Sequence, residues 1–186
     1  DGALTGTVAV FQVEQSSLAT FDADFNKTAI GAAESRGFEV DLNGNITDSL
    51  SILASYSYID AQMTEEFPHP GGFGTVAPAG TALLNIPDHQ LSVQLVQSTS
   101  LAGKPLNVGG GLLYVAERNG FFADEFELPS YTTVRVFSAY DITESIEIRA
   151  EIDNLLGEEY YVNSYSNTWV QPGTPRNYRV SASFKF

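Results

Sequence analysis

The last ten residues, Asn177-Tyr178-Arg179-Val180-Ser181-Ala182-Ser183-Phe184-Lys185-Phe186, alternate between polar and apolar side chains without a break. Successive side chains of a β-strand point to opposite faces of a sheet, so this period of two predicts a strand with one apolar and one polar face. Residues 146–153 repeat the pattern and place every charge on one face. Shorter or less regular copies occupy residues 38–43 and 50–58. The alternation therefore predicts an all-β chain.

About eight segments of this kind follow one another along the chain. They are residues 4–14, 33–43, 50–60, 90–97, 106–116, 131–141, 146–155 and 177–186. Most are close to the roughly 9–11 residues that a tilted strand needs to cross a bilayer. Two segments are less clear: the first has an ambiguous facing, because Val8 and Val10 alternate with Ala9 and Phe11, and the fifth contains the weakening run 109–111, which is all glycine.

The connections between these segments alternate in length. Residues 44–48, 98–105 and 142–145 are short and turn-like, whereas 15–32, 61–89, 117–130 and 156–176 are long and rich in Gly, Pro, Asn and aromatic residues. In an up-and-down antiparallel sheet, alternate connections emerge at opposite edges. Short turns at one edge and long loops at the other are typical of outer-membrane barrels. We therefore expect an antiparallel up-and-down transmembrane β-barrel.

Composition excludes several other classes. The 186 residues are 43% hydrophobic and 12% aromatic, too apolar for a disordered chain and about the size of one domain. The net charge of −14, with only 9 basic residues scattered singly, argues against nucleic acid as a partner. The absence of cysteine excludes disulfides and thiolate metal sites. The longest apolar run, residues 112–116, is far too short for a membrane-spanning helix.

Alternation by itself does not separate a membrane barrel from a soluble one, which buries its apolar face inside. Aromatic residues near the ends of the apolar faces favour the membrane barrel, because such barrels carry aromatic girdles at both interfaces. These residues are Tyr56, Tyr58, Tyr114, Tyr140, Phe184 and Phe186.

No constellation of residues predicts catalysis or metal binding. His69 and His89 are the only histidines, no His-Glu-x-x-His pattern exists, and the Gly-rich stretch 71–74 lacks the Gly-Lys-Ser/Thr ending of a phosphate-binding loop. We therefore expect a protein that is not an enzyme and needs no cofactor. The candidate ligand-binding residues are loop aromatics and two arginines on polar strand faces. They are Phe121, Phe122, Tyr160, Tyr161, Tyr165, Trp169, Arg135 and Arg149. Loop packing and a paired, wet barrel interior explain the same residues without a ligand.

Seven short motifs, in order, resemble landmarks in the barrel of TonB-dependent siderophore receptors. They are RGFEVDL at 36–42, YSYIDA at 56–61, NIPDH at 85–89, LLYVAER at 112–118, LPSYT at 128–132, DNLLGEEYY at 153–161 and PGTPR at 172–176. The terminal Phe186 resembles the aromatic residue by which such barrels are recognised during assembly. Two positions depart from the family pattern: Leu156-Gly157 stands where Phe-Asp is usual, and Arg135 where Asp is common.

The resemblance implies that residues 1–186 are the C-terminal part of a barrel of about 22 strands, with the plug domain and TonB box lying outside this chain. It implies a receptor in the outer membrane of a Gram-negative bacterium that takes up ferric siderophores. Its partners would be the TonB complex, reached through the missing plug, the outer-membrane lipid and the barrel-assembly machinery. Iron would arrive already chelated, so no metal ligands are expected.

Two alternatives stay open on the residues alone. One is a self-contained eight-stranded outer-membrane barrel with a structural or surface-binding role, because eight strands suffice to close a barrel. The other is a soluble ligand-binding barrel. Pairing of the first strand with the last would favour the self-contained barrel. The sequence does not reveal which siderophore is carried, and other cargoes of such receptors, such as cobalamin or glycans, also stay open.

Overall fold

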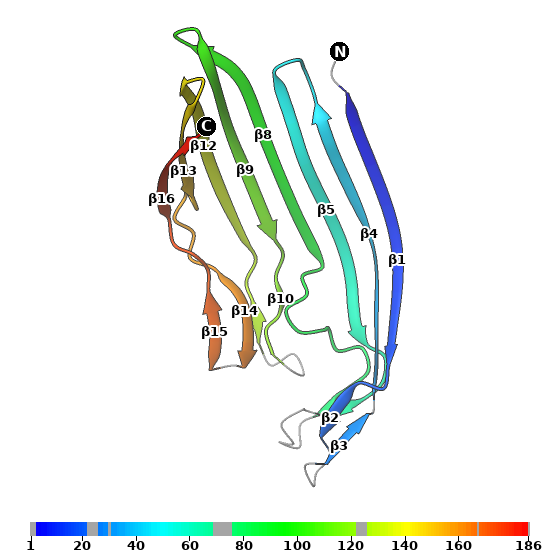
Figure 1. The fold of residues 1–186 in the computed structure, drawn as a ribbon. Coiled ribbons are helices and arrows are strands. Elements are labelled where there is room, and N and C mark those ends of the chain that lie inside the picture. Colours follow the sequence, from blue (N-terminus) through cyan, green and yellow to red (C-terminus); the bar gives the residue numbers. More distant parts are fainter. Residues whose placement is uncertain are drawn as a thin grey trace.

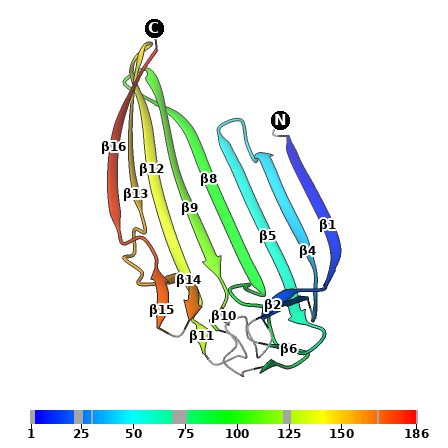
Figure 2. The same cartoon turned by 60° about the horizontal axis from the view of Figure 1, so that its bottom comes forward.

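The computed structural model describes residues 3–21, 26–29, 31–68, 76–121, 126–166 and 168–185. Its main feature is one antiparallel sheet of eight long strands in the order β1-β4-β5-β8-β9-β12-β13-β16 (Figures 1 and 2). The strands are β1 (Leu4–Ser16), β4 (Ala32–Asn45), β5 (Leu50–Met63), β8 (His89–Leu101), β9 (Lys104–Val115), β12 (Tyr131–Thr143), β13 (Ile146–Asp153) and β16 (Asn177–Phe184). The eight predicted strands and the up-and-down order are all present.

Several strands end at other residues than predicted. The connection predicted at 98–105 shrinks to Ala102 and Gly103, whose φ values of 52° and 77° fit the two-residue turn with positive φ that joins twisted hairpin strands. The predicted extension of β13 to residue 155 is wrong, because Asn154 adopts a φ of 50° and turns the chain out of the sheet. The last strand ends at Phe184, and Phe186 lies outside the described residues.

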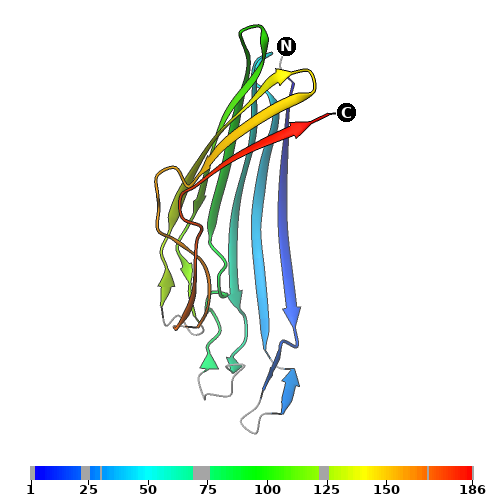
Figure 3. The same cartoon turned by 60° about the vertical axis from the view of Figure 1, so that its left-hand side comes forward.

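The register separates an apolar face from a polar face. Val8 lies opposite Val40 and Val10 opposite Phe38, so the first strand adds its valines to the apolar face. This face is the more exposed one, with Val10 82% and Val180 74% accessible. The other face carries most of the buried residues, including Val115, Phe137 and Glu151, as expected for the inner side of a curved wall (Figure 3).

Aromatic residues lie near both ends of the apolar face. Phe38, in the middle of β4, lies 5.8 Å from both Tyr56 and Tyr58, ring centre to ring centre, and Tyr58 lies 5.1 Å from His89, the first residue of β8. The hydroxyl of Tyr56 is 2.8 Å from Nδ1 of His89. Tyr140 and Phe184 lie near the opposite, turn ends of β12 and β16. Beyond Tyr58, the same face ends in an ion pair between Arg36 and Asp60, 2.8 Å apart.

The long connections contain short hairpins that the sequence pattern does not reveal. These are β2 (Ala19–Phe21) with β3 (Lys27–Ala29), β6 (Phe67–Pro68) with β7 (Val76–Ala77), β10 (Arg118–Asn119) with β11 (Glu127–Leu128), and β14 (Tyr161–Ser166) with β15 (Trp169–Pro172). All four lie at the rim opposite the tight turns, which we call the loop rim (Figures 1 and 2).

The sheet is open. Within the described ranges β1 and β16 form its two edges and do not pair with each other. This arrangement is not that of a closed eight-stranded barrel, which needs its first and last strands hydrogen-bonded. The described part of the chain contains no helix suited to crossing a membrane.

Candidate functional site on the inner wall

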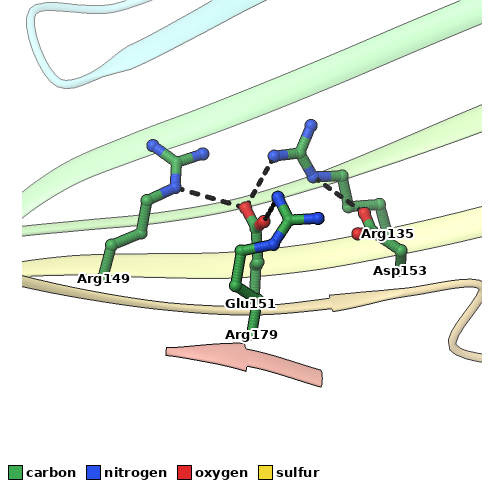
Figure 4. A network of polar contacts seen from close by, with 5 residues as sticks. All are labelled: Arg135, Arg149, Glu151, Asp153 and Arg179. Carbon is green, nitrogen blue, oxygen red and sulfur yellow. Dashed lines mark hydrogen bonds and ion pairs between the residues drawn. The ribbon is translucent and has the colours of Figure 1, made fainter. Parts of the chain in front are cut away.

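A cluster of charged side chains occupies the inner face of β12, β13 and β16 (Figure 4). The side chain of Glu151, only 4% exposed, accepts hydrogen bonds from Arg135 at 2.8 Å, Arg149 at 3.3 Å and Arg179 at 2.5 Å. Nε of Arg135 also lies 3.3 Å from Oδ1 of Asp153. The register explains the convergence, because Arg179 lies directly opposite Glu151 on the neighbouring strand. We call these five residues the Glu151 cluster.

The aromatic ring of Phe137 packs against two arginines of this cluster. Phe137 lies opposite Gly109, where a Cβ atom would overlap the ring, so the glycine leaves the space into which Phe137 packs. The guanidinium carbon of Arg149 is 4.8 Å from the ring centre and that of Arg135 is 5.3 Å from it. Both distances fall within the range of cation–π attraction. The Gly-rich part of β9 is therefore a packing site for the ring that orients two arginines.

The segment after β13 folds back toward the sheet and forms a roof near the cluster. Asn154, 5% exposed, uses its side-chain amide to donate to the carbonyls of Glu158 at 2.8 Å and Thr174 at 3.2 Å. Its Oδ1 accepts from the backbone N–H of Glu158 at 2.8 Å. These bonds tie both ends of the 154–176 connection together. Tyr160 lies against Gly173, and its ring centre is 4.4 Å from that of Tyr131.

Between roof and wall lies a cavity of about 420 Å³. Both Arg135 and Arg179 line it, together with Asp153 and the ring of Tyr160. Gln94 and Thr133 add further polar side chains from the wall. Within the described residues, no group of three or more His, Asp or Glu side chains is placed to hold a metal ion. The polar lining of the cavity suits the binding of a polar ligand.

A second network joins three of the loop-rim connections. Asn85 and Ser164 are bound twice, by the Asn85 amide to the Ser164 carbonyl and by the Ser164 N–H to Asn85 Oδ1, each at 2.8 Å. Arg118 donates to the carbonyls of Tyr161 at 2.7 Å and Val162 at 2.9 Å. Asn119 donates to Ala82 at 2.8 Å. We call Asn85, Arg118, Asn119 and Ser164 the loop clamp.

Burial lowers the pKa of Arg118 from its ordinary value, because desolvation disfavours the charged guanidinium. The ring of Tyr131, 5.7 Å from the guanidinium carbon, offsets part of that cost. Burying an arginine costs desolvation free energy. The hydrogen bonds of Arg118 to two carbonyls of β14 hold that strand in position.

The predicted site residues do not form a single site but lie in several parts of the structure. Arg135 and Arg149 meet in the Glu151 cluster, and Tyr160 forms part of the roof. Tyr161 is 43% exposed, and only its carbonyl is held by Arg118. The remaining described candidates lie elsewhere at the loop rim: Phe121 stacks on Phe126, while Tyr165 and Trp169 meet edge to face at an exposed hairpin. Phe122, like Phe186, lies outside the described residues.

The sequence pattern placed Glu151 and Arg179 among the paired charges expected on the polar strand faces, but they were not among the predicted site residues. Asn154 and the loop clamp were not predicted as site residues either. Asn85 and Asn154 do occur in two of the motifs quoted above, at 85–89 and 153–161, which is the signal that marks them.

A curved antiparallel wall with an apolar outer face, a charged inner face, tight turns at one rim and folded loops at the other defines the class: a segment of an up-and-down β-barrel of the outer-membrane type. Residues 1–155 match the family described as "TonB dependent receptor-like, beta-barrel", and the chain belongs to that family. The predicted resemblance and fold class are therefore confirmed.

Known relatives agree. The metal-pseudopaline receptor CntO of Pseudomonas aeruginosa is 34% identical over 100% of this chain and 26% of its own length. The ferric-pyoverdine BN7/BN8 receptor of Pseudomonas putida is 29% identical over 100% of this chain and 21% of its own. The crystal structure of the siderophore receptor PiuA from Acinetobacter baumannii superposes with a TM-score of 0.85 and 23% identity, over 98% of this chain and 26% of that one. The chain thus spans about a quarter of the length of these relatives.

Proposed function

We propose that this chain is part of the barrel wall of an outer-membrane receptor that takes up metal chelates, ferric siderophores first among them. The observation that carries the proposal is the division of one sheet into an apolar face with aromatic residues near both ends and an inner face with paired charges and a cavity. The names of relatives that match the whole chain support it.

The physical roles of the two faces follow from this placement. The outer face seals the wall against lipid, and its aromatic residues sit at the two membrane interfaces. The inner face borders water or the plug domain, where paired charges cost little. The loop rim, on the outside of the cell, would meet the chelate first. Energy from the TonB complex would reach the barrel through the plug, and Phe186 would serve the barrel-assembly machinery.

The cargo is expected to bring its own metal ligands, so the wall needs none and no resident cofactor. One observation favours a second candidate cargo, a metal chelate of pseudopaline. The metal-pseudopaline receptor is 34% identical to this chain, whereas the ferric-pyoverdine receptor is 29% identical.

The test is metal accumulation by cells that produce the complete receptor and lack their own receptors of this type. Radioactive iron supplied as siderophores, and radioactive metal supplied as the pseudopaline chelate, are compared with and without TonB. We expect accumulation of at least one chelate that requires both the receptor and TonB. Accumulation that is the same without the receptor, or without TonB, would contradict the proposal.

A further inference from the structure

The Glu151 cluster carries an excess of positive charge in an acidic chain. Three guanidinium groups meet two carboxylates, Glu151 and Asp153, so the cluster has a net charge of +1. The chain as a whole has a net charge of −14 and only 9 basic residues, three of which lie here. Glu151 is already bound by all three arginines, and its side chain is almost fully buried.

Two of these arginines retain unused donors beside a cavity. A guanidinium has five N–H donors. Within the described part of the chain, Arg179 makes one hydrogen bond and Arg135 makes one hydrogen bond and one ion pair. Both line the cavity of about 420 Å³ under the 154–176 roof. Their side chains are 64% and 40% exposed, so a ligand in the cavity can reach them.

We propose that Arg135 and Arg179 form a subsite for a carboxylate group of a small soluble ligand. Guanidinium and carboxylate groups match in geometry and form strong charge-assisted hydrogen bonds. One carboxylate group neutralises the cluster, whereas a cation is repelled by it. Asp153 lines the same cavity and holds one side of Arg135, which limits the subsite to a single anionic group. Assigning that group to an arm of an incoming metal chelate rests on the proposed function.

The neighbouring side chains suit such a group. The Thr133 hydroxyl and the Gln94 amide line the cavity, and each supplies a neutral hydrogen-bond donor. Gly111 also lines the cavity and adds no side chain to it.

The test is calorimetric titration of the purified complete receptor with metal-free citrate, with its neutral triamide as a second probe. We expect wild-type receptor to bind citrate and not the triamide. Arg179→Gln should weaken citrate binding about tenfold or more, because hydrogen bonds between charged groups are lost. Arg36→Gln is the matched control: it removes an arginine that is also paired with a carboxylate, but on the outer face, and citrate affinity should not change.

A further variant covers the case in which Arg179→Gln does not fold. Thr133→Leu narrows the cavity and leaves every charge in place, and it should weaken citrate binding as well. Failure of wild-type receptor to bind citrate, or equal losses in Arg179→Gln and Arg36→Gln, overturns the subsite. Citrate binding needs no transport, so metal uptake can fail or succeed independently of this result.

Discussion

Two residues with left-handed backbone shape the roof over the inner wall. Asn154 has a φ of 50° and Gly157 a φ of 73°, so the chain reverses within four residues of leaving β13. At Gly157 a Cβ atom would lie 2.6 Å from Nη2 of Arg176. The resemblance to the family leads one to expect Phe-Asp at 156–157; the glycine found here lets Arg176 pass close to the turn.

Gly157→Ala should destabilise the roof through backbone strain, because the atom nearest its Cβ position is the end of the flexible Arg176 side chain. Gly103→Ala is the matched control, because Gly103 has a φ of 77° but no atom within 4 Å of its Cβ position. We expect about 1–2 kcal/mol of strain in both variants. The end of the Arg176 side chain can move aside at little cost, so the two losses should be similar. Thermal unfolding of the complete receptor measures both, and a clearly larger loss in Gly157→Ala would show that Arg176 is held in place.

Two adjacent glycines of β9 should respond in opposite ways to the same substitution. Gly109→Ala forces the Phe137 ring away from the wall and should cost about 1–3 kcal/mol. Gly110→Ala places its methyl group on the outer face, at an ordinary contact of 3.5 Å from the Arg135 carbonyl. That variant should be neutral or slightly stabilising, since glycine weakens a strand interior. Comparable melting temperatures for the two variants would contradict the packing described for Phe137.

At the scale of elements, the loop clamp makes three connections behave as one unit. Asn85 has a φ of 63°, so Asn85→Gly removes the side-chain hydrogen bonds and keeps the backbone, whereas Asn85→Ala also strains it. The Ser164 amide loses its acceptor in both variants. We expect its hydrogen exchange to accelerate about tenfold, as the loss of one net hydrogen bond implies.

Asn107→Ala is the control for this effect. The Asn107 side chain accepts a single hydrogen bond, from Ser98, so exchange at Ser164 should not change. Unchanged exchange in Asn85→Gly would mean that the loops are held by other contacts.

The strands could be predicted from the sequence, but the contacts between loops could not. Alternation is a local signal, and it correctly placed Arg135, Arg149 and Glu151 on one face. It did not reveal that Glu151 would bind all three arginines, because that depends on register between strands. The loop clamp could not be predicted from local patterns, because Asn85 and Ser164 are 79 residues apart in sequence. Predicted strand ends were mostly too short because polar residues such as those of β8 beyond residue 97 continue the hydrogen-bonded ladder without continuing the apolar pattern.

For the whole molecule, the open edges decide how this segment behaves alone. Unpaired backbone groups are costly in lipid, and exposed edges pair with other chains. Residues 1–186 produced alone in detergent should therefore form oligomers through β1 and β16, whereas the complete receptor should not. Light scattering after size-exclusion chromatography distinguishes the two. A monomer in which a cysteine pair across β1 and β16 forms a disulfide would instead indicate closure of the eight strands.

The two edge strands run in opposite directions, since β1 starts and β16 finishes at the rim of tight turns (Figure 1). This fixes the parity of any ring that contains the sheet. With antiparallel neighbours all round, the strands that bridge β16 to β1 must be even in number. If the number of bridging strands is odd, one pair of neighbouring strands in the ring must be parallel.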